Sequence, residues 1–192
     1  MKTPGSVLVP LLDGFEEIEA VTIIDVLRRA GVEVVVAGVE PGPVRGSHDI
    51  ELTAEVALSE VDPAPLAMIA LPGGMPGAAK LREHPEVQRL IRAVDQREGF
   101  VAALCAAPIA LAPSGVLAGK LVTSYPGVED QLTGAEVVTD RVVVDGRVVT
   151  SRGPGTALEF ALTLVGLLAG ADKEAALERA MLVARGGPPR RV

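Results

Sequence analysis

The feature that most constrains the fold is a regular alternation of short aliphatic runs with longer segments of helical periodicity. The aliphatic runs predict buried strands at residues 7–12, 32–39, 66–71 and 100–104. The periodic segments predict helices at residues 16–30, 85–98, 156–169 and 173–184. This order of elements predicts an α/β protein with an open, doubly wound, mostly parallel sheet that carries helices on both faces.

Weaker patterns predict the remaining elements. Residues 44–54 are expected to hold short extra strands, and residues 106–112 a short helix. Residues 137–139 and 141–150 are interpreted as a hairpin pair, with Asp145-Gly146 as a tight turn. We see no internal repeat and no linker, so residues 1–186 are expected to form a single domain and residues 187–192 a loose C-terminal tail.

Composition narrows the class of protein. Of 192 residues 48% are hydrophobic but only 2% aromatic, so the core must consist of Val, Leu, Ile and Ala. The net charge of -7 argues against nucleic acid or an anionic membrane as a partner. The longest apolar stretch, residues 160–171, is too short to span a bilayer, and the N-terminus does not have the pattern of a signal peptide.

The chain contains one cysteine and two histidines, which limits the kinds of disulfide and metal site that it can form. A single cysteine excludes an internal disulfide, and a Cys/His zinc cluster is not expected from so few ligands. A lone thiol suits a reducing compartment, and we therefore expect a cytoplasmic protein. The sequence offers no evidence for a metal or an organic cofactor.

Cys105 follows the predicted strand 100–104 directly, and the small residues Ala106 and Ala107 begin the next turn. This pattern is typical of a nucleophile elbow, in which a reactive side chain stands on a sharp turn from strand to helix. Free N–H groups at a helix N-terminus would lower the thiol pKa and raise its reactivity. The alternative is a small buried hydrophobic side chain, which is the usual role of a free cysteine.

Glu19 is the second candidate. Glu16 and Glu17 suit the first turn of the predicted helix, where carboxylates complement the helix dipole. Glu19 instead shares a helix face with Ile23 and Val26, so its carboxyl is expected to be partly buried and to take up a proton at neutral pH. A protonated carboxyl can donate to a thiolate or relay protons. A surface glutamate at the edge of the buried face remains the alternative.

Two further features are weaker. Gly73 and Gly74 follow the strand 66–71 and allow backbone N–H groups to approach a ligand closely, so they are candidates for an oxyanion site opposite the thiolate. Tyr125, the only tyrosine, precedes Pro126 and is expected in a loop, where its phenol can donate a proton. A packed loop aromatic is the alternative for Tyr125.

Taken together, these segments resemble the ThiJ/PfpI superfamily, and most closely its branch around the parkinsonism-associated protein deglycase. The resemblance covers nearly the whole chain. Its motifs are specific in this order and spacing: residues 14–19, Asp25-Val26-Leu27-Arg28-Arg29-Ala30-Gly31, Leu71-Pro72-Gly73-Gly74, Cys105-Ala106-Ala107-Pro108, and Thr150-Ser151-Arg152-Gly153-Pro154-Gly155-Thr156.

The resemblance implies a flavodoxin-like fold and a homodimer. It implies that Cys105 is the reactive, oxidation-prone nucleophile and that Glu19 is its carboxyl partner. It places the amides of Gly74 and Ala106 near the oxyanion position.

It also implies that Arg29 and the Gly153-Pro154 turn lie near the site or the dimer interface. Members of the family are credited with glyoxalase activity, with removal of early aldehyde adducts from proteins, and with redox sensing or chaperone roles.

Three positions depart from the family pattern. Tyr125 stands where the deglycase has a histidine, so Glu19 or water must act as the base. Ala106 stands where the protease branch has a histidine, which argues against a Cys-His peptidase. His48 replaces an arginine near the interface and is interpreted as a solvated loop residue or one that reaches a site from the other subunit, and His84 as a solvated loop residue.

Three functions follow, in this order. The first is a cysteine-dependent glyoxalase or deglycase that acts on small α-oxoaldehydes or on glycated proteins. The second is a non-catalytic redox sensor or chaperone that works through oxidation of Cys105. The third and least favoured is an amidase or peptidase.

Overall fold

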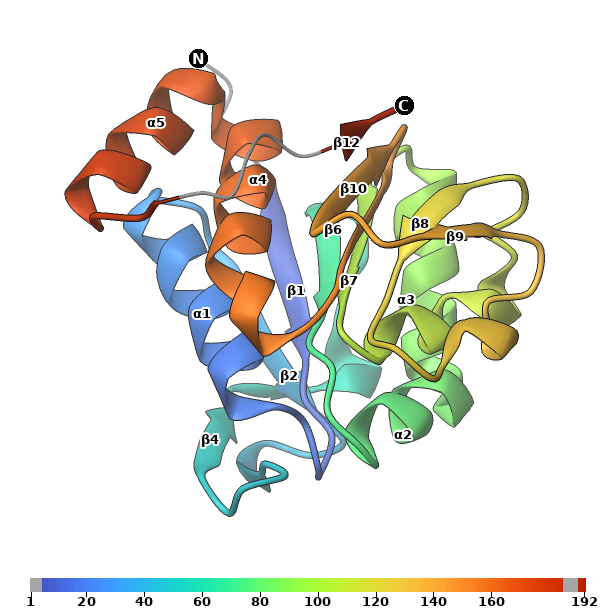
Figure 1. Ribbon diagram of the computed structural model, residues 1–192. Helices are drawn as coiled ribbons and strands as arrows, with labels where there is room; N and C mark the ends of the chain where they lie inside the picture. The colour runs from blue at the N-terminus through green and yellow to red at the C-terminus, as the bar shows by residue number, and fades with distance from the viewer. Residues whose placement is uncertain (1–4, 185–189) are drawn as a thin grey trace.

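The computed structural model describes residues 5–184 and 190–192. Its centre is a sheet with the strand order β12-β10-β11-β7-β6-β1-β2-β5 (Figure 1). β10 and β11 pair antiparallel, whereas the other neighbours in this sheet are parallel. The strands are β1 Ser6–Pro10, β2 Val34–Gly38, β5 Val56–Ala57, β6 Leu66–Leu71, β7 Phe100–Leu104, β10 Val142–Asp145, β11 Val148–Ser151 and β12 Arg190–Arg191.

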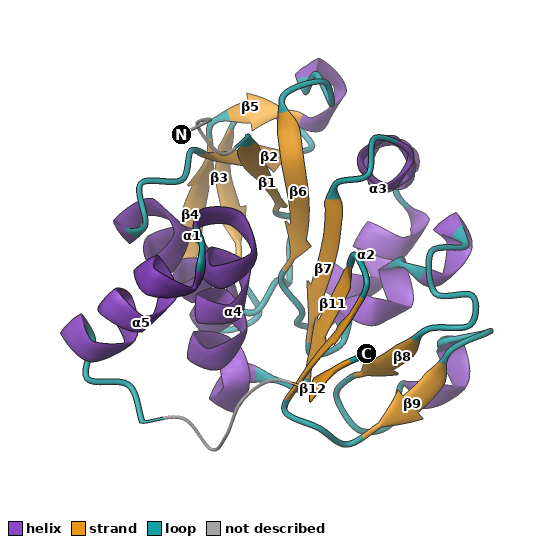
Figure 2. Ribbon diagram, turned by 90° about the horizontal axis from the view of Figure 1, so that it is seen from above, coloured by secondary structure: helices purple, strands orange, loops and turns teal. Residues whose placement is uncertain are grey.

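Helices cover both faces of this sheet. α1 (Glu17–Arg29), α4 (Ala157–Ala169) and α5 (Ala171–Ala180) lie on one side, and α2 (Gly77–Glu83) and α3 (Pro85–Gln96) on the other (Figure 2). α3 shows why the sequence folds in this way, because its apolar residues recur every three or four positions and are buried against β6 and β7. The predicted doubly wound α/β fold with helices on both faces is confirmed.

The core between these layers is aliphatic. Val, Leu, Ile and Ala supply most of its buried side chains, as the low aromatic content requires. Phe15 and Phe160 are the two largest fully buried side chains. Each fully buried Leu or Ile contributes roughly 1.5–3 kcal/mol, so the aliphatic side chains supply most of the stabilisation of this core.

Some local predictions were wrong. β9 (Glu136–Val138) pairs in parallel with β8 (Leu121–Thr123) rather than forming a hairpin with β10, because the Asp145-Gly146 turn already pairs β10 with β11. In place of the short helix expected over residues 106–112, the chain forms two short 3-10 turns at Ala107–Ala110 and Ala112–Ser114. The extra strands expected within residues 44–54 are present as β3 (Gly42–Arg45) and β4 (Glu51–Ala54), which pair antiparallel.

The C-terminal tail also differs from the prediction. Residues 185–189 lie outside the described part of the chain. Residues 190–192 are not loose, because β12 pairs with β10 and the amide of Val192 donates to the carbonyl of Val144 at 3.0 Å. These backbone bonds cover an otherwise open sheet edge.

The sheet topology determines where a site can form. β1, β6 and β7 are neighbours in the sheet, and their carboxyl ends lead into residues 11–16, Pro72-Gly73-Gly74 and Cys105. From β1 the chain runs to β2 on one side of it and later enters β6 on its other side. The crevice between β1 and β6 is therefore a topological switch point. The candidate residues are therefore placed where doubly wound sheets bind ligands.

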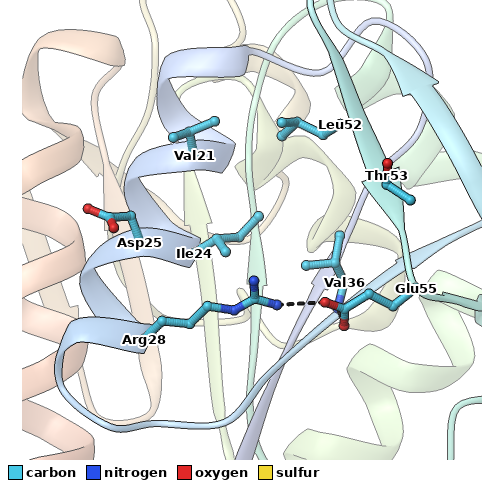
Figure 3. Close-up of a pocket in the computed structure, with 8 residues that line it drawn as sticks. All are labelled: Val21, Ile24, Asp25, Arg28, Val36, Leu52, Thr53 and Glu55. Atoms are coloured by element: carbon cyan, nitrogen blue, oxygen red, sulfur yellow. Dashed lines mark hydrogen bonds and ion pairs between the residues drawn. The ribbon is translucent and has the colours of Figure 1, made fainter.

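A second surface feature lies between α1 and β4. A groove of about 320 Å³ is lined by apolar side chains of both elements and closed at one end by an ion pair between Arg28 and Glu55, with a nitrogen-to-oxygen distance of 2.7 Å (Figure 3). Val21 and Leu52 line the groove, and Ile18 and Ile50 on the same two segments are exposed. In residues 5–184 and 190–192 no helix has both the length and the apolar character needed to cross a bilayer.

Candidate active site

Cys105 stands on a sharp turn at the end of β7. Its φ angle is +62°, a left-handed conformation that is unfavourable by roughly 1–2 kcal/mol for a residue with a side chain. Two backbone bonds hold it there: its amide donates to Ser151 at 2.9 Å, and its carbonyl accepts from the amide of Tyr125 at 2.8 Å. The backbone therefore has the geometry of a nucleophile elbow, and the side chain, which is 7% exposed, lines an open cleft.

Glu19 is fully buried, with 0% of its surface exposed. Its Oε2 accepts a hydrogen bond from the amide of Gly73 at 2.7 Å, while its Oε1 has no hydrogen-bond partner of ordinary length among the described residues. Burial raises the pKa of this carboxyl from 4.5 to about 7, against the opposing effects of the Gly73 amide and the Cys105 thiol. The carboxyl is therefore buried more completely than the predicted partial burial, and it is not a surface glutamate.

The thiol of Cys105 behaves differently from the sequence-based expectation. Burial, followed by the charge of Glu19, raises its pKa from 9.0 to about 12, although the amides of Ala106 and Gly74 act in the opposite direction. The predicted decrease in the thiol pKa does not occur, because burial and the charge of Glu19 outweigh the amides of the short 3-10 turn that follows Cys105. At pH values between about 7 and about 12, Glu19 and Cys105 therefore hold one proton between them.

The two glycines have separate roles. The amide of Gly73 is occupied by Glu19, so it is not free to bind an oxyanion, in contrast to the prediction. The amides of Gly74 and Ala106 instead face the sulfur of Cys105. A Cβ atom at Gly73 would lie 2.7 Å from the Cβ of Cys105 and 2.9 Å from Oε2 of Glu19, so only glycine allows these groups to approach each other.

The cleft in front of Cys105 has a volume of about 560 Å³. Its walls are mainly apolar, and its polar groups come from α1, the loop before β4 and the loop after β8. Tyr125, which is 50% exposed, and Pro154 form one wall, and Gly153 lies behind the tyrosine ring. The lining residues are Glu16, Glu17, Ile18, His48, Ile50, Gly74, Met75, Cys105, Ala106, Tyr125 and Pro154.

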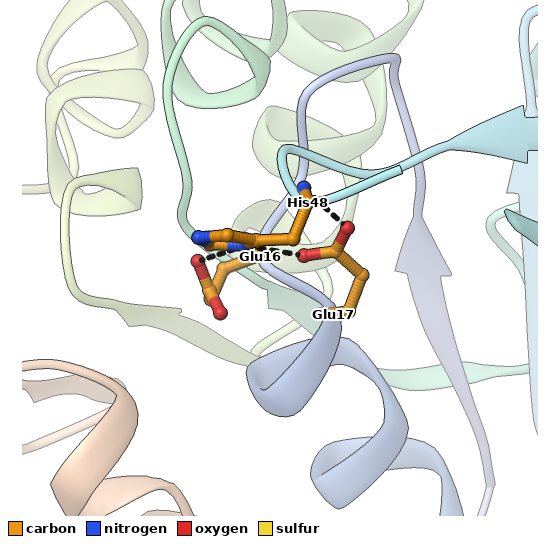
Figure 4. Close-up of side chains that lie close together, drawn as sticks. All are labelled: Glu16, Glu17 and His48. Carbon is orange, nitrogen blue, oxygen red and sulfur yellow. Dashed lines mark hydrogen bonds and ion pairs between the residues drawn. The ribbon is translucent and has the colours of Figure 1, made fainter. Parts of the chain in front are cut away.

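Glu17 and His48 form a polar pair that sequence reasoning missed. Glu17 is 4% exposed, and its Oε1 accepts from the backbone amides of His48 at 2.6 Å and Ile50 at 3.4 Å. Its Oε2 is 3.0 Å from Nδ1 of His48 (Figure 4). Burial raises the pKa of Glu17, but the bonds from His48 and the backbone outweigh it and lower the pKa to about 2.

Glu16 completes this cluster. Its carboxylate lies 3.6 Å from Nδ1 of His48 and accepts from the hydroxyl of Ser47 at 3.3 Å. In the described part of the chain, the ligand atoms of Glu16, Glu17 and His48 are the ones that lie close enough together, within 4.8 Å, to hold a metal ion. Their mutual hydrogen bonds already satisfy these atoms. No sequence signal pointed to the cluster, because it depends on the β3–β4 loop folding back over the start of α1.

Arg29 is not part of this site. It ends α1 and pairs with Asp25 at 2.7 Å, and the helix rise places it about 15 Å along the axis from Glu19. Of the residues predicted from sequence, the fold brings Cys105, Glu19, Gly73, Gly74 and Ala106 together, with Tyr125, His48, Gly153 and Pro154 around the cleft. A role for Arg29 at a dimer interface stays a prediction.

Comparison with known proteins gives consistent results. The model of the DJ-1/PfpI family matches residues 5–167. Protein dj-1beta of Drosophila melanogaster is 43% identical over 182 residues, which cover 93% of this chain and 97% of that protein. The glutathione-independent glyoxalase DJR-1.2 of Caenorhabditis elegans is 37% identical over 181 residues, or 93% of this chain and 96% of that protein.

The structural comparison agrees with the sequence comparison. The crystal structure of Drosophila melanogaster DJ-1beta superposes with a TM-score of 0.91 at 42% identity, covering 95% of this chain and all of that one. Sequence and fold agree over nearly the whole length, and the chain therefore belongs to the DJ-1/PfpI family.

Proposed function

We propose that this chain is a cofactor-independent glyoxalase that converts α-oxoaldehydes to 2-hydroxy acids at Cys105. One observation carries the proposal: a cysteine held on an elbow faces a buried carboxyl whose pKa of about 7 lets it both take and give a proton at neutral pH. A relative from Caenorhabditis elegans bears the name of a glutathione-independent glyoxalase, which supports the same reaction class.

The first step forms a carbon–sulfur bond. A thiol with a pKa of about 12 needs a base, so ionised Glu19 takes the proton from Sγ as the sulfur attacks the aldehyde carbon. The carbonyl oxygen becomes an alkoxide and accepts hydrogen bonds from the amides of Gly74 and Ala106. Glu19 then returns the proton to this oxygen, which gives a neutral hemithioacetal.

The second step moves hydrogen between adjacent carbons. Ionised Glu19 removes the proton from the former aldehyde carbon and delivers it to the neighbouring keto carbon through an enediol, while the hydroxyl proton of the hemithioacetal passes to the former keto oxygen. The first carbon is oxidised to a thioester and the second is reduced to an alcohol, so no external oxidant or reductant is needed. Water then cleaves the thioester, which releases the 2-hydroxy acid and restores the thiol.

The cleft suits more than one substrate of this class. Its volume of about 560 Å³ accommodates a free dicarbonyl or the end of a modified side chain, so we include early aldehyde adducts on proteins among the substrates. Tyr125 is a candidate proton donor from the cleft wall, and Tyr125→Phe is expected to lower kcat by at least tenfold with little change in KM. An unchanged kcat assigns Tyr125 to the wall alone.

The decisive assay is formation of D-lactate from methylglyoxal by the pure protein. Wild type is expected to form D-lactate, and Cys105→Ser and Glu19→Gln to lose at least a hundredfold in kcat. The proposal fails if wild type makes no more product than these two variants.

A second function, peroxide sensing, is favoured by the surroundings of the sulfur. The amides of Gly74 and Ala106 and the unpaired Oε1 of Glu19 are arranged to hydrogen-bond the oxygens of a sulfinate. However, oxidation follows thiolate content, and the raised pKa of Cys105 therefore favours the enzyme. Mass spectrometry after mild peroxide treatment separates the two, with exposed Met75 as the internal control. A reduced Cys105 beside an oxidised Met75 excludes sensing.

We also propose that the chain forms a homodimer in the cytoplasm through the groove between α1 and β4. Val21 lines this groove and is 44% exposed, and a second copy would cover it. The adjacent charges of Asp25 and Arg28 suit an isologous contact, in which each surface meets its own copy.

A further inference from the structure

His48 has the placement of an oriented imidazole in the cleft of Cys105. Both residues line the same cavity, although they are separated by 57 positions in the chain. The loop that carries His48 is held down by its own backbone, because the amide of His48 donates to Glu17 at 2.6 Å and that of Ser47 donates to the carbonyl of Phe15 at 2.8 Å. The ring is therefore positioned by a rigid anchor at the start of α1.

The bond to Glu17 selects one tautomer of this ring. Glu17 is ionised at neutral pH, so it can only accept, and Nδ1 of His48 at 3.0 Å must be the donor. In the neutral ring Nε2 is then the free acceptor. The bonds that the ring makes with described residues use Nδ1, and the side chain is 69% exposed, so Nε2 is accessible to water (Figure 4). A carboxylate that orients an imidazole in this way is the arrangement found in hydrolytic triads.

We propose that His48, oriented by Glu17, is the general base that activates water for hydrolysis of the Cys105 thioester. The inference rests on the proposed glyoxalase function. It supplies a base for thioester hydrolysis, the one step of that mechanism to which no base has been assigned. Nε2 takes a proton from water as the oxygen attacks the thioester carbon. The carbon–sulfur bond then breaks, and the thiolate regains its proton from the imidazolium as the 2-hydroxy acid leaves.

Glu19 and His48 differ in a property that this step requires. Glu19 has no exposed surface. This suits a proton shuttle between two carbons of a bound substrate, but it leaves no access for a water molecule that Glu19 could deprotonate. His48 lines the cleft and its side chain is 69% exposed, so water can reach its ring. The two bases thus divide the reaction into an internal proton transfer and a hydrolysis.

The charges around His48 also favour this role. Glu17 and Glu16 face the ring from α1, and Asp49 lies beside it on the same loop, where Arg45 pairs with Asp49 at 3.4 Å. The bond to Glu17, followed by the charges of Glu16 and Glu17, raises the pKa of His48 above its ordinary 6.5. A higher pKa makes the neutral ring a stronger proton acceptor, which suits a general base.

The test compares His48→Arg, His48→Ala and the control His84→Gln with wild type. Arginine keeps the positive charge and a donor for Glu17 but cannot accept a proton, so it separates base catalysis from electrostatics. Because His48 is exposed, neither variant should affect folding. Methylglyoxal turnover is measured in the steady state, and acid-quenched samples are analysed by intact mass for an acyl group on Cys105.

Both His48 variants are expected to lose at least a hundredfold in kcat and to accumulate the acyl-enzyme. Added imidazole should restore His48→Ala, and His84→Gln should behave as wild type. The inference is wrong if His48→Arg keeps kcat within threefold, or if kcat falls without accumulation of the acyl-enzyme. Absence of any product from wild type would instead refute the proposed function itself.

Discussion

Glu19 should make the folded protein less stable as the pH rises, and Glu19→Gln should remove this effect. In the unfolded chain the carboxyl titrates near 4.5, whereas in the folded protein burial raises the pKa to about 7. Between these values the folded state holds a proton that the unfolded state has lost. The free energy of unfolding therefore falls as pH rises through this window and levels off above the folded pKa.

The magnitude follows from the shift. One pKa unit corresponds to about 1.4 kcal/mol, so a shift from 4.5 to about 7 amounts to about 3 kcal/mol in total. Glutamine has nearly the same shape and can still accept the hydrogen bond from the Gly73 amide, but it does not titrate. The stability of Glu19→Gln relative to wild type should therefore rise by about 3 kcal/mol from acid to neutral pH.

Urea unfolding of both proteins at half-unit steps from pH 5 to 8 measures this difference. Every other titrating group is common to the two proteins and cancels in the comparison, and the range stays below the titration of the Cys105 thiol. Most of the increase should appear between pH 5 and 7, followed by a plateau. A difference that does not change with pH would refute the argument, because the carboxyl would then titrate alike in both states.

Three further predictions test other parts of the structure. Gly73→Ala should lower the free energy of unfolding by about 1–3 kcal/mol and abolish turnover, since its Cβ would lie 2.7 Å from that of Cys105; an unchanged urea midpoint would contradict this. Val21→Asp should convert a dimer to a monomer in sedimentation equilibrium, whereas the same change at Val39, which is also exposed, should not, and a wild-type monomer would exclude the interface. Deletion of residues 190–192 should lower the free energy of unfolding by less than about 1 kcal/mol, because the lost hydrogen bonds between β12 and β10 lie at an exposed sheet edge.

These predictions share a physical theme. Two features of the cleft are energetically unfavourable. Cys105 has a left-handed backbone conformation, and the Glu19 carboxyl is buried without full hydrogen bonding. Each of these features lowers stability, and each supplies reactivity in the proposed mechanism. Removing Glu19 should accordingly stabilise the fold while it abolishes activity.

Local patterns in the sequence predicted much of the fold. β6 and β7 begin and end where the aliphatic runs do, because a buried strand needs an unbroken apolar segment that ends at a turn. The same reasoning found the turn at Cys105, and the apolar face of α1 indicated that Glu19 is buried. These features depend on neighbours within a few residues, so periodicity and turn residues reveal them.

The tertiary structure decided what those residues do. The amide of Gly73 meets Glu19 across 54 positions, and Nδ1 of His48 meets Glu17 across 31 positions, and no local pattern encodes either pairing. Burial by distant segments raises the thiol pKa of Cys105 where the local turn had suggested a decrease. The sequence alone thus determined the main strands, the long helices and the turn that carries Cys105. Proton affinities and partners depend on which groups the packed core excludes from water, and only the assembled fold determines that.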